Sequence, residues 1–404
     1  MRILAANSFH YRRGGDSSHF LDLVAELENR GHEVATFSMQ HARNLPSRWE
    51  DYWAPNVEYR GKLTVLDRLH ASWRSVYSAE SARRMARLLA DFEPDIVHFH
   101  SVHHQLTMSV VQACFSRGVP VVWTLHDYRT VCPAISLLRG SAICERCAGG
   151  RFWHGVTGHC KSGELTRSLA AAAESYLTQA KGTLRRVDCY IAPSRFLARK
   201  TIEMGLPARR IEVVPNPVQT QAVAAVGDHR RGLLYVGRLS VEKGVGCLIH
   251  AVAGLQNAPL RIVGDGPAAD NLRTLATRLG ADVLFDGWAD ATSVRLRMAK
   301  AELLCVPSIV YENCPGVVLE AMAAGLPVIA SDLGGLTELL DDGRAGWLVP
   351  AGDPAAWRRA ICEALGDEAR TARQAARALE RVRERHDTQA FIRRIEAIYL
   401  SLAS

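Results

Sequence analysis

Two glutamates that could bind a sugar stand eight residues apart in the segment 311–330. Glu312 comes before a Pro-Gly step that predicts the start of a helix, and Glu320 falls in the first turns of that helix. The free N–H groups of Gly316 and Val317 would face an anion, and the carboxylates would accept hydrogen bonds from sugar hydroxyls. The helix dipole alone could explain Glu320, but it does not explain Glu312.

A pair of cations, Arg238 and Lys243, follows the predicted strand 232–236 on the turn to the next predicted helix. Two cations that converge beside a cleft can neutralise a diphosphate leaving group without a metal ion. Solvated surface charge is the competing interpretation. The position of the pair after a strand, where loops carry function, favours the anion site.

Two further loops follow predicted strands. Gly14 and Gly15 lie between the strand 2–6 and a helix over 17–30, where exposed N–H groups and the helix dipole predict a phosphate cradle. A tight turn would use the same residues, and the pattern is neither a Walker loop nor G-x-G-x-x-G. Trp288 follows the strand 283–285 and would either wall a nucleobase pocket or be an ordinary surface side chain. The Gly-Asp-Gly-Pro segment 264–267 is predicted as a turn.

A second constellation consists of four of the ten cysteines, with the spacing C-x11-C-x2-C-x12-C. Its members are Cys132, Cys144, Cys147 and Cys160. Cysteines in a chain without a secretion signal are typical of reduced thiols or metal ligands. The pattern predicts a structural tetrathiolate zinc site. Unligated thiols and a redox pair are the alternatives, because zinc ribbons usually carry two C-x-x-C pairs.

The elements that must position these residues repeat in both halves of the chain. Short β-branched runs alternate with glycine turns and helical segments, which is typical of parallel sheets with helices on both faces. We therefore predict an α/β protein with two doubly wound, Rossmann-like domains facing a central cleft. The predicted domains are 1–219, with a cysteine-containing insert at 132–160, and 232–385. Residues 220–231 are predicted as a linker, and 386–404 as a terminal helix that packs back on the first domain.

Composition narrows the class of protein. The chain of 404 residues is 48% hydrophobic and 23% charged, which excludes disorder and allows two cores. We find no signal-peptide core and no apolar run of about 18 residues, so we expect a cytoplasmic protein. Residues 1–220 carry 28 Lys and Arg against 20 Asp and Glu, and 221–404 carry 21 against 22. The excess of positive charge in residues 1–220 would suit peripheral contact with the inner membrane face, although a scatter of solvated arginines is the simpler interpretation. No nucleic-acid partner is expected, because no recognition motif is present.

The run from Glu312 to Gly335 resembles the E-x7-E signature of the retaining glycosyltransferases of family 4, which have the GT-B fold. The loops at 14–15, 214–218, 237–243 and 264–267 fall in the family order, so the resemblance covers nearly the whole chain. It implies a nucleotide-sugar donor, retention of anomeric configuration and catalysis without a metal. The cysteine-containing insert of this chain is similar to inserts in members of the family that act in polysaccharide assembly.

The resemblance also implies roles for individual residues. Gly14 and Gly15 match the loop that meets the donor phosphate and the reacting centre, and Arg238 and Lys243 match the pair that binds the diphosphate. Glu320 matches the carboxylate that binds the ribose.

Two further positions match groups that contact the transferred sugar. Glu312 matches a carboxylate on that sugar, and His126, after the predicted strand 119–125, matches a histidine directed at it. With Gly15, these are the expected catalytic residues. The chain departs from the pattern at Asn313-Cys314-Pro315, which leaves the donor sugar open.

These observations predict a retaining hexosyl transferase that uses a UDP- or GDP-sugar. The acceptor would be a hydroxyl of a glycan, a lipid-linked sugar or a small molecule, within polysaccharide or glycosylated-metabolite assembly. An epimerase or phosphorylase of the same fold, or a non-catalytic protein that binds nucleotide sugars, are the alternatives. No catalytic metal is expected, and the four cysteines are the candidate structural zinc site.

Overall fold

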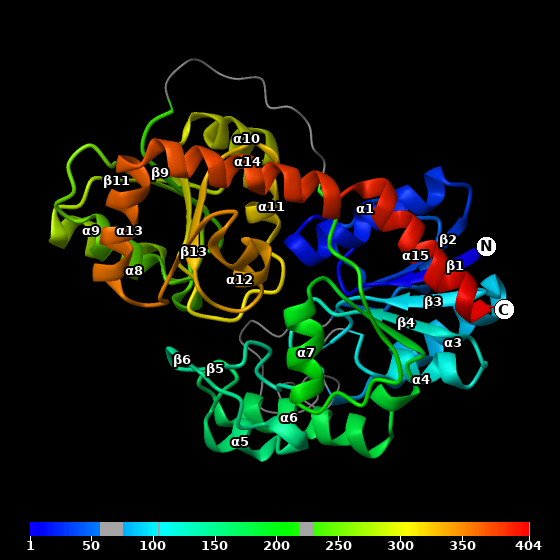
Figure 1. Ribbon diagram of the computed structural model, residues 1–404. Helices are drawn as coiled ribbons and strands as arrows, with labels where there is room; N and C mark the ends of the chain where they lie inside the picture. The colour runs from blue at the N-terminus through cyan, green and yellow to red at the C-terminus, as the bar shows by residue number, and fades with distance from the viewer. Residues whose placement is uncertain (57–75, 104–105, 219–229, 404) are drawn as a thin grey trace. The chain divides into compact units, whose positions relative to one another are not determined.

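The computed structural model describes residues 1–56, 76–103, 106–218 and 230–403, which divide into two compact units (Figure 1). The first unit comprises residues 1–139, 144–214 and 392–404, and the second comprises 140–143 and 215–391. Within the described ranges, no helix combines the length and apolar character needed to cross a membrane.

The first unit contains a parallel sheet with the strand order β2-β1-β3-β4-β7-β8. Its strands are β1 (Arg2–Ala6), β2 (Glu33–Phe37), β3 (Ile96–Phe99), β4 (Val121–Thr124), β7 (Cys189–Ala192) and β8 (Ile211–Val213). Every residue of β3, β4 and β7 is buried, as expected for parallel strands covered on both faces. The chain continues from β1 toward one edge of the sheet and from β3 toward the other edge. The switch point of this sheet, where the loops after the strands diverge, therefore lies between β1 and β3.

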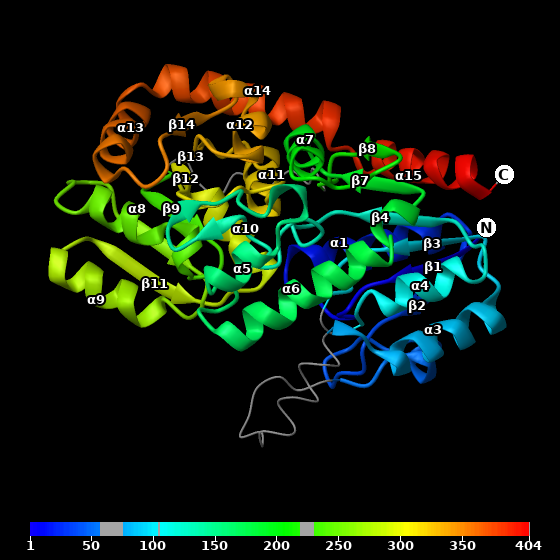
Figure 2. The same ribbon diagram turned by 90° about the horizontal axis from the view of Figure 1, so that it is seen from below.

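Helices cover this sheet, and their sequences explain where they begin and which face they bury. They are α1 (Gly15–Asn29), α3 (Ala79–Phe92), α4 (Ser109–Phe115), α6 (Leu165–Ala180) and α7 (Arg195–Glu203). The side chain of Ser78 caps α3 by accepting from the N–H of Ser81. The apolar residues Met85, Leu88 and Phe92 recur at helical spacing and are buried. Figure 2 shows α3 and α4 side by side along the sheet.

The second unit contains a parallel sheet in the order β11-β10-β9-β12-β13-β14. Its strands are β9 (Leu233–Val236), β10 (Leu260–Val263), β11 (Val283–Gly287), β12 (Leu303–Val306), β13 (Val328–Ser331) and β14 (Trp347–Val349). Counted from β9, the order is 3-2-1-4-5-6, which is the order of a Rossmann dinucleotide-binding sheet. The prediction of two Rossmann-like domains is confirmed.

Alternate residues of these strands point to opposite cores. Leu233 and Tyr235 of β9 join the core under α8 (Val245–Val252), α9 (Ala269–Leu279) and α13 (Pro354–Gly366). Leu234 between them joins the core under α10 (Ala291–Lys300), α11 (Gly316–Ala323), α12 (Gly335–Leu339) and α14 (Glu368–Arg385). Because a strand has a period of two, both faces need apolar residues, which gives the continuous hydrophobic runs in the sequence.

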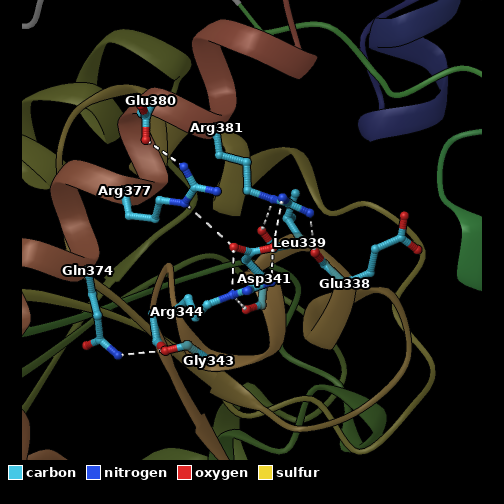
Figure 3. A network of polar contacts seen from close by, with 10 residues as sticks. Glu338, Leu339, Asp341, Gly343, Arg344, Gln374, Arg377, Glu380 and Arg381 are labelled. Atoms are coloured by element: carbon cyan, nitrogen blue, oxygen red, sulfur yellow. Dashed lines mark hydrogen bonds and ion pairs between the residues drawn. The ribbon is translucent and has the colours of Figure 1, made fainter.

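A buried network anchors α12 to α14 (Figure 3). Arg381 donates to the carbonyl oxygens of Glu338 and Leu339 at 2.8 and 3.2 Å and to the carboxylate of Asp341 at 3.0 Å. Arg377 is also paired with Asp341, at 3.6 Å. The network satisfies carbonyl groups at the end of the short helix α12, which fixes the position of the residue that opens it, Gly335.

The chain leaves the second unit through α15 (Thr388–Ala403), whose residues from 392 onward belong to the first unit. The hydroxyl of Tyr399 lies 2.6 Å from Nδ1 of the buried His98 on β3, and Glu396 accepts from Arg30 at 2.7 Å. These contacts attach the C-terminal helix to the first sheet.

The boundary between the two units lies close to the predicted domain boundary. The N-terminal part of the first unit ends at Val214, five residues before the predicted boundary at 219, and the unit resumes at Ile392. Residues 215–218 belong to the second unit, where the N–H of Val218 donates to the carbonyl oxygen of His386 at 3.0 Å. Of the predicted linker 220–231, all but Arg230 and Arg231 lie outside the described residues.

Candidate active site

The second sheet has its switch point between the adjacent strands β9 and β12. The chain continues from β9 through α8 toward one edge of the sheet and from β12 through α11 toward the other. In open α/β sheets, ligands bind at the carboxyl ends of the strands where the connections diverge in this way. The loops 237–244 and 307–315 begin at this point.

The structure brings Lys243 and Glu312 together at this switch point. The ammonium Nζ of Lys243 donates to Oε1 of Glu312 at 2.6 Å, and the hydroxyl of Ser308 donates to the same oxygen at 2.6 Å. The Glu312 side chain is only 13% exposed and that of Lys243 is 29% exposed. Both bonds fall on Oε1, so Oε2 has no partner among the described residues. This arrangement leaves Oε2 able to accept from a ligand hydroxyl.

Close backbone contacts hold the loop that carries Glu312. The N–H of Gly335 donates to the carbonyl oxygen of Glu312 at 2.6 Å. A Cβ on Gly335 would lie 1.9 Å from the carbonyl oxygen of Asn313, and a Cβ on Gly244 would lie 1.9 Å from that of Pro307. Only glycine permits these two approaches, so the fold itself requires glycine at both positions.

The Gly-Asp-Gly-Pro turn holds the Arg238 loop in a similar way. A Cβ on Gly264 would lie 1.9 Å from the carbonyl oxygen of Gly237, and the N–H of Leu239 donates to the carbonyl oxygen of Asp265 at 3.0 Å. This motif therefore supports the cation-bearing turn. Arg238 itself has an exposed side chain, and its carbonyl oxygen accepts from the hydroxyl of Tyr235 at 2.9 Å.

Helix α11 presents its N-terminus on the β12 side of the switch point. Its hydrogen bonding starts at Val318, whose N–H donates to the carbonyl oxygen of Pro315 at 3.0 Å. The N–H groups of Gly316 and Val317 are therefore among the orphan donors of the first turn. A Cβ on Gly316 would lie 3.9 Å from Oε1 of Glu320, so this carboxylate folds back toward the helix N-terminus.

The environment of Glu320 differs from that of Glu312. Glu320 is an exposed residue, but the atoms packed around its carboxyl group raise the pKa of Glu320 above its ordinary value, while the positive charge of Arg295 acts in the opposite direction. A carboxyl with a raised pKa is suited to hydrogen bonding with hydroxyl groups.

Trp288 is 78% exposed and follows β11, which is the edge strand of the sheet. Two strands, β10 and β9, separate β11 from the switch point. A role for Trp288 as the wall of a nucleobase pocket stays a prediction.

In the first unit, Gly14 and Gly15 lie at the start of α1, after β1 and beside its own switch point. Gly14 is the N-cap of the helix, has extended backbone and cannot supply a capping side chain. A Cβ on Gly15 would meet no described atom within 4 Å, and one on Gly14 would meet only Oδ1 of Asp16, at 3.5 Å. Packing among the described residues therefore does not explain the two glycines.

Three histidines from different elements meet near this loop: His19 on α1, His100 after β3 and His126 after β4. Nδ1 of His100 lies 3.0 Å from Nε2 of His126, and the two rings are stacked with centroids 5.3 Å apart. Burial lowers the pKa of all three side chains, and neighbouring imidazoles lower those of His19 and His100 further. They are therefore neutral imidazoles near pH 7.

These histidines could also hold a metal ion, because one ligand nitrogen from each lies within 4.8 Å of the other two. They are the one such group found in the described part of the chain. The sequence singled out His126 but missed His19, His100 and the Ser308 hydroxyl. His100 could have been found as the polar residue directly after the buried strand β3, and Ser308 as a polar residue two positions after β12, whereas His19 has no comparable signal.

Family models match both halves of the chain. The model described as Glycosyltransferase Family 4 matches residues 13–222, more than half of the chain, and Glycosyl transferases group 1 matches residues 230–367. The chain belongs to glycosyltransferase family 4. The resemblance carried by the E-x7-E motif is confirmed, and the protein is a glycosyltransferase.

Similar proteins cover nearly the full length of this glycosyltransferase. It is 28% identical to the phosphatidyl-myo-inositol mannosyltransferase of Mycobacterium leprae over 403 residues, which is 97% of this chain and 94% of that protein. Sucrose-phosphate synthase from Thermosynechococcus elongatus has a similar fold, with a TM-score of 0.73 at 20% identity over 100% of this chain and 99% of that one. HepE from Anabaena, solved in complex with UDP and glucose, has a TM-score of 0.69 at 20% identity over the whole of both chains. These likenesses confirm the GT-B fold class.

Proposed function

We propose that this glycosyltransferase moves a hexosyl group from a nucleotide sugar to an acceptor hydroxyl with retention of anomeric configuration. The observation that carries the proposal is the Lys243–Glu312 pair at the switch point of the second sheet. An ammonium group suits a diphosphate and a carboxylate suits sugar hydroxyls, so this pair has the chemistry that the two ends of a nucleotide sugar require.

The lysine can serve both partners because an ammonium group has three donors. One N–H bond goes to Glu312, and the others are directed to the donor diphosphate together with Arg238 and the N–H groups of Gly316 and Val317. These groups offset the negative charge that develops on the leaving diphosphate, so no catalytic metal is required for that purpose. Glu312 then accepts from a hydroxyl of the transferred sugar through Oε2.

The other predicted site residues are assigned roles by the same match between their chemistry and the parts of a nucleotide sugar. Glu320 binds the ribose, and Trp288 lies against the nucleobase. Gly14 and Gly15 present backbone N–H groups to the donor phosphate, and the neutral imidazole of His126 donates to or accepts from the sugar.

In the reaction, the bond between the sugar C1 and the donor phosphate oxygen breaks while a bond from C1 to the acceptor oxygen forms on the same face. The proton of the acceptor hydroxyl passes to the departing phosphate oxygen. The protein supplies orientation and charge stabilisation instead of a covalent nucleophile.

The donor is proposed to be a UDP- or GDP-hexose. HepE was solved with UDP and glucose, and the mycobacterial relative is named a mannosyltransferase. Glucose and mannose are both hexoses. A glycan, lipid-linked or small-molecule hydroxyl is the proposed acceptor. The net charge of +8 over residues 1–220 supports peripheral contact with an anionic membrane surface if the acceptor is lipid-linked.

The test incubates the full chain with UDP-glucose or GDP-mannose, with and without an alkyl hexoside acceptor, and follows nucleotide release. We expect release that depends on the acceptor, persists in excess EDTA and gives an α-linked product by NMR from an α-linked donor. A β-linked product would exclude retention, and a strict need for added Mg²⁺ would exclude the proposed role of the cations.

The same assay separates the alternatives. Conversion of the donor to an isomeric nucleotide sugar without acceptor would indicate an epimerase, and a requirement for inorganic phosphate would indicate a phosphorylase. Tight binding of UDP or GDP with no turnover across the donors would indicate a binding protein.

A further inference from the structure

The four-cysteine segment that follows β4 has little regular structure of its own. Between β4 and α6 the described chain forms the two-residue strands β5 (Leu138–Arg139) and β6 (Ala142–Ile143) and the short helices η2 (Ala148–Gly150) and α5 (Trp153–Thr157). Elements this small bury little apolar surface, and small irregular modules usually depend on a metal or disulfides for order. The structure contains no disulfide among these cysteines.

All four thiols nevertheless converge. The Cys147 thiol interacts electrostatically with those of Cys132, Cys144 and Cys160, and the Cys160 thiol interacts with those of Cys132 and Cys144. Cys132 and Cys147 are buried, at 6% and 8% exposure. The fold therefore gathers thiols from three parts of the segment, which are Cys132, the C-x-x-C pair and Cys160.

Backbone contacts hold together the parts of the chain that carry the cysteines. The N–H of Ile135 donates to the carbonyl oxygen of Cys132 at 2.9 Å, and the N–H of Cys144 donates to that of Leu137 at 2.8 Å. The N–H of Cys160 donates to the carbonyl oxygen of Gly155 at 3.0 Å, and a Cβ on Gly155 would lie 3.5 Å from Cγ of Pro133, the residue after Cys132. These contacts place the segments of Cys132, Cys144 and Cys160 beside one another.

The C-x-x-C pair itself adopts a compact turn. The N–H of Ala148 donates to the carbonyl oxygen of Glu145 at 3.0 Å, and Gly149 and Gly150 follow with φ of +69° and +82°. This turn spans residues 145–148, so it contains Cys147 and begins directly after Cys144, and the left-handed glycines then lead the chain away.

A positive charge lies beside the cluster. A Cβ on Gly158 would lie 2.7 Å from the Cys160 sulfur and 3.2 Å from Nε of Arg139, so this thiol and this guanidinium group are neighbours. Four thiolates around a divalent ion carry a net charge of two negative units, which Arg139 would partly offset.

We propose that Cys132, Cys144, Cys147 and Cys160 bind one structural zinc ion that orders the segment 132–160. Binding replaces the four S–H protons, which pass to solvent, with four Zn–S bonds. No three of the four sulfurs lie within 4.8 Å of one another, and tetrahedral Zn–S bonds of about 2.3 Å would draw all four to about 3.8 Å apart. This inference goes beyond sugar transfer, because the ion would have a closed coordination shell and no open position for a substrate.

The three-histidine group is the competing zinc site. Its nitrogens are close enough for an ion, but His100 and His126 already satisfy each other through a hydrogen bond of 3.0 Å. Zinc prefers four thiolates to three imidazoles when the sulfurs can close around it. Variants at the two sites therefore locate the ion.

The test measures zinc by elemental analysis in the full chain purified anaerobically without chelator. We expect about one zinc per chain, lost in Cys147→Ser and Cys160→Ser but kept in Cys114→Ser, Cys362→Ser and His126→Ala. The two control cysteines are one buried and one exposed thiol outside the cluster. Zinc that survives both cluster variants but disappears in His126→Ala would overturn the proposal.

A second measurement covers variants that fail to fold. Titrating the wild-type chain with a mercurial should release its zinc after four thiols have reacted, and Co²⁺ substitution should give the charge-transfer and visible bands of a tetrahedral thiolate site. Zinc-free protein whose four thiols alkylate freely, or a Cys144–Cys147 disulfide in the native protein, would overturn the assignment. Affinity for UDP or GDP should be unchanged in Cys147→Ser, so failure of this proposal is distinguishable from failure of the proposed function.

Discussion

The glycine loops at the two switch points differ in what requires their glycines. In the second unit, a Cβ at Gly244, Gly264 or Gly335 would lie 1.9 Å from a backbone oxygen of a neighbouring loop. In the first unit, a Cβ at Gly15 would meet no described atom within 4 Å. The fold therefore accounts for the second set, whereas Gly15 calls for a reason outside the described chain. Close approach of a ligand is such a reason.

The two regions also differ in charge. The second unit presents an ammonium and a carboxylate joined at 2.6 Å, with an exposed arginine on the same loop as the lysine. The first presents a cluster of imidazoles that burial keeps neutral. Fixed charges suit a diphosphate, whose charge changes during transfer, and neutral donors and acceptors suit hydroxyl groups.

Glu312→Gln tests the charged region most severely. We expect kcat/KM to fall about 1,000-fold, equivalent to about 4 kcal/mol, with little change in thermal stability, because the amide cannot replace the carboxylate as an acceptor paired with Lys243. Glu380→Gln, which alters a surface pair with Arg377, is the matched control and should retain full activity. Near-normal turnover in a folded Glu312→Gln enzyme would remove Glu312 from the reaction.

Two glycine variants test the contrast between the loops. Gly335→Ala should destabilise the protein by about 2–3 kcal/mol, because the new methyl group would meet the carbonyl oxygen of Asn313. Gly15→Ala should leave thermal stability unchanged or slightly raised and lower kcat/KM at least about tenfold. Denaturant titration and steady-state kinetics on both variants check this. A stability loss in Gly15→Ala as large as that in Gly335→Ala would erase the distinction.

Lys243→Met examines the diphosphate site alone. Removing a charged donor should weaken the affinity for UDP or GDP about 10- to 100-fold, which is about 1.5–3 kcal/mol. Lys300→Met, at an exposed position at the end of α10, is the control and should bind normally. Calorimetry that finds unchanged nucleotide affinity in Lys243→Met would place the diphosphate elsewhere.

The smallest effect concerns pH and the buried His98, whose ring centroid lies 4.4 Å from that of His100 in the neutral cluster. Burial lowers the pKa of His98 from 6.5 to about 3, so the folded state excludes a proton that the unfolded state binds. The free energy of unfolding is therefore undiminished above about pH 6.5 and declines as the pH falls toward 3, and the loss caused by His98 amounts to about 2 kcal/mol at pH 5.

The measurement compares melting temperatures at pH 7.5 and pH 5. The wild type should lose several degrees more than His98→Gln, in which this titration is absent, while His250→Gln, an exposed control, should behave as the wild type. Equal losses in His98→Gln and the wild type would show that His98 is not held neutral by the fold.

The sequence by itself determined the class of fold and much of the site. Alternating buried strands and helices predicted two Rossmann-like domains, because residues in parallel strands must be apolar on both faces. The Pro-Gly step before Glu320 predicted the helix N-terminus at Gly316, since capping and dihedral preferences act within a few residues. These signals are local, so they can be read without knowing which strands are neighbours.

Only the tertiary structure decided which distant residues meet. Lys243 and Glu312 lie 69 residues apart and come together because β9 pairs with β12, and His98 and Tyr399 lie 301 residues apart and meet because α15 belongs to the first unit. The three histidines gather for the same reason, from a helix and two strand ends. Strand order and helix docking depend on the packing of the whole domain, which no local pattern of residues specifies.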